Sequence, residues 1–255
     1  MEKYRVGILG ATGMVGQRLL CLLENHPFFD VTALAAGPRS AGRTFSQATA
    51  GRWKIKTAAP ARCTNMPVFD AVSEMEKIRE RVDFVFCAVD MPKEDVLALE
   101  EMYARAEVPV VSNNSANRWT PDVPMLIPEI NAAHIALIAA QRRRLGTRRG
   151  FVVVKPNCSI QSYVPALTPL RRFGLERVSV TTFQAVSGAG HTLADMPQII
   201  DNVIPYIPGE EEKSEREPLR VWGTPKDGAI ELAAAPVISA QCLRVTVSDG
   251  HMAAV

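Results

Sequence analysis

Short apolar runs alternate with amphipathic stretches through the first part of the chain. Continuous runs rich in Val, Ile and Leu predict buried strands at 4–9, 31–36, 83–89, 108–112 and 151–154. Helical spacing predicts one helix with Val15, Leu19, Leu22 and Leu23 on a shared face, and others near 72–81, 93–106 and 132–144. This alternation is typical of a parallel sheet with helices on both faces. The pattern predicts an α/β fold, with a Rossmann-type doubly wound domain over residues 1–157.

The pattern changes after residue 158. Residues 178–186 alternate strictly between apolar and polar side chains, which indicates an antiparallel strand with one solvated face. A second strand of this kind is predicted at 242–247, and residues 251–255 resemble the start of another. A helix near 193–204 and an acidic turn at 209–213 are expected between them. Residues 158–255 are therefore predicted to form a second domain of the α+β kind.

One cysteine follows the central apolar strand directly. Pro156 ends the strand, Asn157 is a good helix N-cap, and Cys158 is predicted in the first turn of a short or kinked helix. Free N–H groups and the positive end of the helix dipole favour a thiolate there. The same N–H groups could hold the oxyanion formed when the sulfur attacks a carbonyl carbon. The alternative is a buried, inert cysteine.

A glycine-rich turn, GATGMVG at residues 10–16, follows the first predicted strand and precedes a helix. Strand, glycine turn and helix form the context that a dinucleotide-binding fingerprint requires. Gly10, Gly13 and Gly16 would allow a tight turn and a close approach of a pyrophosphate to the helix N-terminus. Nucleotide binding is favoured over a purely structural turn.

The residues after the second strand favour NADP over NAD as the cofactor. An NAD site usually places an acidic residue there, on the ribose hydroxyls. This chain has Arg39 and Ser40 instead, and an arginine beside a hydroxyl suits a ribose 2′-phosphate. A solvated loop arginine is the alternative. After the strand at 108–112, a second polar cluster contains Asn114 and Arg118, and Arg118 is a candidate for binding an anionic group.

Composition excludes several classes of function. The 255 residues carry 29 basic and 27 acidic side chains, so no overall field points to nucleic acid or membrane. No apolar run is long enough to span a bilayer, and no signal peptide is apparent. The five cysteines are scattered without a CxxC pair, which is typical of a reduced, cytoplasmic protein and offers no metal site.

Seven motifs occur in one order that resembles the aspartate-semialdehyde dehydrogenase family, in its archaeal and fungal branch. They are GATGMVG, PRSAG, SNNSANR, PNCS, FQAVSGAG, GEEEK and LRVTVSDGH. The resemblance implies a dinucleotide-binding domain and a catalytic and dimerisation domain like that of glyceraldehyde-3-phosphate dehydrogenase. It also implies NADPH-dependent reductive dephosphorylation of β-aspartyl phosphate to aspartate semialdehyde, with release of inorganic phosphate. That reaction leads toward lysine, threonine and methionine.

The resemblance also assigns catalytic and substrate-binding roles. Cys158 would be the nucleophile that forms an acyl-thioester, His251 the general acid and base, and Gln184 the residue that orients the substrate. Arg244 would bind the substrate α-carboxylate, and Glu210 its amino group. The phosphate-binding groups would be Arg118, Asn157 and Lys213.

Further matches with the family concern the cofactor. The implied contacts are Gly10, Thr12, Gly13, Met14, Val15, Gly16, Arg39, Ser40, Asn114, Ser187 and Gly188. Gly37 stands where the family usually has a serine, so one contact to the 2′-phosphate is in doubt.

The resemblance implies a homo-oligomer, either a dimer or a tetramer. Relatives are longer at the C-terminus, so residues 1–255 alone are expected to leave an open sheet edge and to be inactive or to aggregate. Malonyl-CoA reductase and N-acetyl-glutamyl-phosphate reductase share the same plan of nucleophile and NADP. These enzymes, and a non-catalytic NADP-binding sensor, are the alternative functions.

Overall fold

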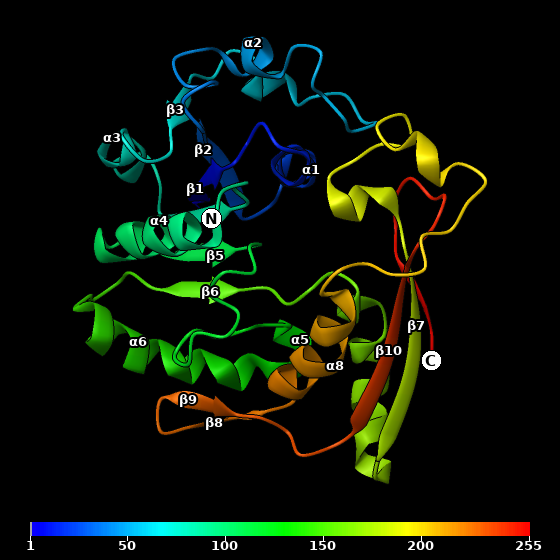
Figure 1. Cartoon of the computed structure of the whole chain (residues 1–255). Coiled ribbons are helices and arrows are strands. Elements are labelled where there is room, and N and C mark those ends of the chain that lie inside the picture. The colour runs from blue at the N-terminus through cyan, green and yellow to red at the C-terminus, as the bar shows by residue number, and fades with distance from the viewer. Residues whose placement is uncertain (1) are drawn as a thin grey trace. The chain divides into compact units, whose positions relative to one another are not determined.

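The computed structural model describes residues 2–255, which form two compact units (Figure 1). The first unit runs up to Pro124 and includes Ile138–Val154, and the second comprises Met125–Leu137 and Lys155–Val255. Met125–Leu137 therefore packs in the second unit, although the sequence assigns it to the nucleotide-binding part. The functional division at residue 157 stays a prediction.

The first unit contains a six-stranded sheet in which every pair of neighbouring strands is parallel. Its strands are β1 (Tyr4–Leu9), β2 (Phe29–Ala36), β3 (Val68–Asp70), β4 (Phe84–Cys87), β5 (Val110–Ser112) and β6 (Val152–Val154). The order β3-β2-β1-β4-β5-β6 changes direction between β1 and β4, which is the switch point of a doubly wound sheet. The predicted α/β class is confirmed. Only β3 was missed, because three residues in a polar stretch give no periodic signal.

The helices of this unit are α1 (Met14–Leu23), α2 (Phe45–Thr49), α3 (Met75–Arg79), α4 (Lys93–Arg105) and α6 (Leu137–Leu145). Figure 1 shows α1 and α4 on opposite sides of the sheet. The predicted apolar face of α1 is partly wrong, since Val15 and Leu22 are exposed while Leu20 and Leu23 are buried. The reason is Gly16, whose close approach to the glycine turn fixes the rotation of the helix. Within residues 2–255, no helix has the length and apolar character needed to cross a bilayer.

A single carboxylate holds the loop that precedes β6. Glu107 follows α4 and accepts hydrogen bonds from the N–H groups of Arg148, Arg149 and Gly150 at 2.6–3.1 Å. These backbone hydrogen bonds lower the pKa of Glu107 to about 2. The chain must stay close here, because a Cβ on Gly150 would lie 1.8 Å from the carbonyl oxygen of Ala104. The start of β6 is thereby fixed, and the chain leads from its end to Cys158.

The second unit is a mixed α+β structure, as predicted. Its α-helices and strands are α5 (Pro128–Asn131), α7 (Val164–Leu167), β7 (Arg177–Gln184), α8 (Glu210–Val221), β10 (Val237–Arg244) and β11 (Met252–Ala254), with a hairpin of β8 (Thr224–Lys226) and β9 (Ala229–Glu231). The main sheet has the order β10-β7-β11, and α8 packs against β10. Short 3₁₀ turns at 132–136, 160–162, 168–173, 186–189 and 197–199 complete it.

Several local predictions for this unit are wrong. The alternation of β7 is confirmed, but β7 pairs parallel with β10 and antiparallel only with β11. Alternation reports which face is buried and carries no information on strand direction. The strand expected at 242–247 is β10 at Val237–Arg244, and the segment near 193–204 forms turns in place of a helix.

The acidic segment at 209–213 begins a helix and is not a turn. Glu210, Glu211 and Glu212 form the first turn of α8, where their charges complement the positive end of the helix dipole. The predicted acidic turn is thus the start of twelve residues of helix with one buried face.

We predict that Glu107→Gln lowers the melting temperature at pH 7, because an amide cannot replace a carboxylate that accepts three N–H groups. The folded pKa of about 2 lies below the usual value of 4.5, so this stabilisation is complete above pH 4.5 and disappears as the pH falls toward 2. The difference in melting temperature should therefore narrow as the pH falls from about 4.5 to about 2. Glu76→Gln, which removes an exposed carboxylate paired with Arg79, is the control and should change little. An equal effect of the two substitutions would contradict the assignment.

Candidate active site

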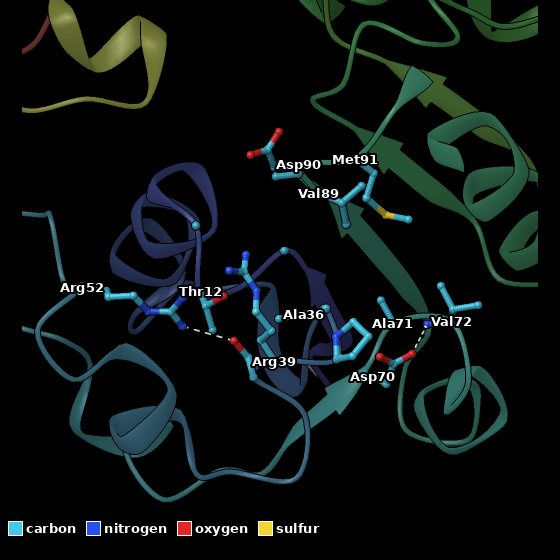
Figure 2. Close-up of a pocket in the computed structure, with 16 residues that line it drawn as sticks. Thr12, Ala36, Arg39, Arg52, Asp70, Ala71, Val72, Val89, Asp90 and Met91 are labelled. Atoms are coloured by element: carbon cyan, nitrogen blue, oxygen red, sulfur yellow. Dashed lines mark hydrogen bonds between the residues drawn. The ribbon is translucent and has the colours of Figure 1, made fainter. Parts of the chain in front are cut away.

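A pocket of about 490 Å³ opens at the carboxyl ends of β1 to β4 (Figure 2). It is lined by residues at the ends of these four strands, among them Ala36 and Asp70 as last residues of β2 and β3, and Gly10 and Ala88 directly after β1 and β4. Ligands of doubly wound sheets bind at this edge, beside the switch point. The lining is mostly apolar near Val72, Val89 and Met91 and basic near Arg39 and Arg52.

Glycine is needed for different reasons at the three glycine positions of the predicted fingerprint. Gly10 has φ +87°, and a Cβ there would lie 2.3 Å from the carbonyl oxygen of Ala88. A Cβ on Gly16 would lie 2.2 Å from the carbonyl oxygen of Gly10. By contrast, Gly13 is the N-cap of α1, lines the pocket, and has room for a Cβ. Gly10 and Gly16 are therefore needed by the fold, and Gly13 keeps the helix N-terminus open to a ligand.

Two arginines reach the basic end of the pocket, and the sequence revealed only one of them. Arg39 and Ser40 line it as predicted. Arg52 lines it as well, and its Nη2 donates a hydrogen bond to Ser40 Oγ at 3.2 Å (Figure 2). The buried Gln17 side chain fixes the loop of Arg52, because Nε2 donates to the carbonyl oxygens of Thr12 and Arg52 at 3.0 and 2.9 Å. No local motif marks Arg52, which belongs to a featureless polar stretch.

The remaining predicted residues of the first unit lie around this pocket and near the end of β5. Thr12 lines the pocket, whereas Met14 and Val15 form the first turn of α1 and are not among the lining residues. Asn114 and Arg118 share the turn after β5, where Asn114 Nδ2 donates to the carbonyl oxygen of Val89 at 2.6 Å. Arg118 is only 6% exposed.

In the second unit, the thiol of Cys158 is exposed and lies 3.2 Å from His251 Nε2. The cysteine occupies a turn before a 3₁₀ segment at 160–162, so the predicted first turn of an α-helix is corrected to a tighter turn. Asn157 still caps it, because its Oδ1 accepts the N–H of Ser159 at 2.8 Å. The inert, buried alternative for Cys158 is excluded by its exposure.

The backbone determines the proton position on His251. Nδ1 accepts the N–H of Ala185 at 3.1 Å, so the neutral imidazole carries its proton on Nε2, which faces the sulfur. Burial lowers the pKa of His251, and the positive charge of Arg244 lowers it further. The imidazole is therefore neutral near pH 7 and donates its Nε2 hydrogen toward Cys158.

The parallel pairing of β7 and β10 brings together two predicted residues. Gln184 and Arg244 are the last residues of these strands and lie opposite each other in the register. Both are buried, and Arg244 Nη1 donates to the carbonyl oxygen of Ala185 at 2.9 Å. Antiparallel pairing of these two strands would have put the two residues at opposite ends of the sheet.

Glu210 gathers three of the other predicted residues. Its carboxylate accepts hydrogen bonds from Asn157 Nδ2 at 3.1 Å, Gln184 Nε2 at 3.2 Å and Lys213 Nζ at 2.7 Å. Burial alone would raise the pKa of Glu210, but Lys213 and the amide donors outweigh burial and lower it. Glu210 is therefore an ionised carboxylate at the N-terminal end of α8.

The loop after β7 has room for the imidazole only because Gly188 lacks a side chain. A Cβ there would lie 2.7 Å from His251 Cε1 and 3.0 Å from Arg244 Nη1. Ser187 is the neighbouring residue in the same 3₁₀ turn. Seven of the predicted residues thus cluster within the second unit: Cys158, His251, Gln184, Arg244, Glu210, Asn157 and Lys213. No group of three potential metal ligands occurs among the described residues.

A Rossmann-type unit, followed by a second unit with an exposed cysteine beside a histidine, is the combination expected of a dehydrogenase. Family models agree, since residues 5–138 match the NAD-binding domain of semialdehyde dehydrogenases and residues 167–255 match their dimerisation domain. The first unit is accordingly an NAD(P)-binding domain.

Individual relatives narrow the class. The chain is 40% identical to an aspartate-semialdehyde dehydrogenase of Archaeoglobus fulgidus, with 99% of this chain and 71% of the relative covered. It is 39% identical to that of Aspergillus fumigatus, covering 98% of this chain and 68% of the relative. The solved structure of the Candida albicans enzyme with NADP superimposes with a TM-score of 0.84 at 34% identity, covering 99% of this chain and 70% of that one. The chain belongs to the aspartate-semialdehyde dehydrogenase family.

We predict opposite outcomes for alanine at two glycines of the fingerprint. Gly16→Ala should destabilise the protein by about 1–3 kcal/mol, because the new methyl group meets rigid backbone. Gly13→Ala should cost less than about 1 kcal/mol of stability but weaken NADPH binding, because its Cβ enters the pocket. Thermal denaturation and NADPH fluorescence titration measure the two effects. Normal NADPH affinity in Gly13→Ala would refute the assignment of the pocket.

Proposed function

We propose that this chain catalyses the NADPH-dependent reductive dephosphorylation of L-aspartyl 4-phosphate to L-aspartate 4-semialdehyde. The observation that carries the proposal is the 3.2 Å contact between Cys158 Sγ and His251 Nε2, beside an ionised Glu210 and a buried Arg244. A related solved structure, aspartate semialdehyde dehydrogenase II of Vibrio cholerae complexed with ASA, supports this class of substrate at 26% identity and a TM-score of 0.71, covering 98% of this chain and 73% of that one.

In the proposed reaction, the Cys158 thiolate attacks the acyl carbon of the substrate. The bond to the phosphate oxygen breaks, and inorganic phosphate leaves with the proton given up by the thiol. Bound NADPH would supply the hydride that reduces the resulting thioester. The tetrahedral oxyanion then collapses, and breaking of the carbon–sulfur bond returns the thiolate. His251 holds its Nε2 proton where it can stabilise the sulfur or the substrate oxygen.

The substrate needs a cationic and an anionic holder, and the site offers both. Arg244 would bind the α-carboxylate, and Glu210 the amino group. Because Lys213 already pairs with Glu210 at 2.7 Å, substrate binding would exchange partners. The substrate ammonium would replace Lys213 as the partner of Glu210. Lys213 would then bind the substrate phosphate together with Asn157. Gln184 would orient the acyl group from the end of β7. Arg118 would add a further phosphate contact.

The preferred cofactor in this proposal is NADP. Two guanidinium groups and the hydroxyl of Ser40 form the basic end of the pocket, as a ribose 2′-phosphate requires. The chain would work as a homodimer or tetramer, supported by its dimerisation domain. Free cysteines at all five positions suit a reducing, cytoplasmic compartment.

Acylation of Cys158 tests the function without requiring turnover. Aspartyl phosphate, added without NADPH, should transfer its aspartyl group to Cys158, as detected by peptide mass spectrometry. Cys158→Ala should abolish the adduct, and His251→Gln should slow its formation by about 100-fold. The control Cys21→Ala changes a thiol of the first unit and should acylate normally. Acylation by malonyl-CoA alone would instead support a malonyl-CoA reductase, and no acylation by either would support a sensor.

The cofactor preference generates a second test. Arg39→Met and Arg52→Met should each weaken NADPH binding about 10-fold or more and leave NADH binding nearly unchanged, because each removes a charge-assisted hydrogen bond to the 2′-phosphate. Arg43→Met, which makes the same charge change in the same loop outside the pocket lining, is the matched control. An equal loss of affinity for both cofactors would argue against a 2′-phosphate site.

A further inference from the structure

One face of α8 contacts the residues on both sides of Cys158. Glu210, Ser214 and Glu217 are four and three positions apart, so they lie on the same face of the helix, and all three are buried. Glu210 accepts from the Asn157 side chain, and Ser214 Oγ lies 3.2 Å from Ser159 Oγ. Glu217 Oε2 accepts the backbone N–H of Asn157 at 2.5 Å.

These contacts decide which N–H groups of the turn remain open to a substrate. The N–H of Asn157 is taken by Glu217, and the N–H of Ser159 is taken by Asn157 Oδ1 at 2.8 Å. Of the three consecutive N–H groups, that leaves the one on Cys158 as the candidate donor to an oxyanion. Without the bond to Glu217, the Pro156–Asn157 peptide would be free to rotate, and because the chain runs on from it into Cys158, the rotation would redirect both the Cys158 N–H and the sulfur.

No motif in the sequence around Glu217 predicts a role for it. It is 1% exposed, and a carboxyl group is seldom buried unless its hydrogen bonds serve the structure or the chemistry around it. Its hydrogen bond to the Asn157 N–H acts on the turn, so its effect on the thiol is indirect.

We propose that Glu217 is a positioning residue, which fixes the Asn157 peptide so that Cys158 presents its sulfur to His251 and its N–H to the substrate. The proposal rests on the function proposed above, in which Cys158 is the nucleophile. It assigns to α8 two separate tasks, since Glu210 serves the substrate and Glu217 serves the nucleophile.

The rate of Cys158 alkylation by iodoacetamide at pH 7 tests this role. Peptide mass spectrometry reads the rate, and Cys21 serves as internal reference. Glu217→Ala should slow alkylation about 10-fold, because the thiol loses its fixed position beside the imidazole. Glu217→Gln should restore the rate to within about 2-fold, because the amide oxygen still accepts the Asn157 N–H. Glu217→Asp keeps a carboxyl group and is a smaller change that should disturb folding less. In this variant Cys158 should be alkylated at an intermediate rate.

The matched control is Glu215→Ala on the same helix. Glu215 accepts the backbone N–H of Ala240 at 3.1 Å, so this change also removes a carboxylate-to-backbone bond from α8. It should lower the melting temperature and leave Cys158 alkylation unchanged. A wild-type rate in both Glu217→Ala and Glu217→Asp, or an equal slowing in Glu215→Ala, would overturn the proposal. If alkylation follows the prediction but aspartyl phosphate never acylates wild-type Cys158, the proposed function fails while the positioning role stands.

Discussion

The parallel register of β7 and β10 is the constraint on which the candidate catalytic cluster depends. It ends both strands at the same edge, so that Gln184 and Arg244 lie opposite each other. The backbone of the next residue, Ala185, then binds both His251 and Arg244. Its N–H donates to His251 Nδ1, and its carbonyl oxygen accepts from Arg244 Nη1. A slip of one position would turn every side chain of the slipped strand to the other face and separate these groups.

The sequence revealed what is local and missed what depends on distant pairing. The glycine turn after β1 and the cysteine after β6 are contiguous patterns, and both lie where strand and turn chemistry predicted them. Strand direction was only partly correct, because β7 pairs antiparallel with β11 but parallel with β10, a partner sixty residues away, and alternation does not encode direction. Arg52 was missed for a similar reason, since Gln17 and Ser40 place it in the pocket across a featureless loop.

Within the site, the individual residues came mainly from the ordered motifs, and their mutual arrangement came from the fold. A lone glutamine in a strand is ordinarily a solvated residue, yet Gln184 is 1% exposed and bonded to Glu210. The segment at the start of the helix that carries Glu210 was itself expected to be a turn. Periodicity alone could not show it, because the buried face of α8 is largely polar and contains Glu210, Ser214 and Glu217. A hydrophobic pattern cannot mark a helix whose buried face bonds to a turn.

The proton arrangement explains what kind of thiol this site can activate. In many thiol enzymes an imidazolium stabilises the thiolate. Here a protonated His251 would place its Nδ1 hydrogen facing the N–H of Ala185, so that two donors would oppose each other. Both burial and the charge of Arg244 also lower the pKa of His251. The guanidinium of Arg244 interacts electrostatically with Cys158 and supplies positive charge near the sulfur, with hydrogen bonds from neutral His251 and the backbone. A carboxylate held by Arg244 would neutralise part of that charge and weaken this stabilisation of a thiolate, so the hydrogen bonds would carry more of it once the substrate is bound.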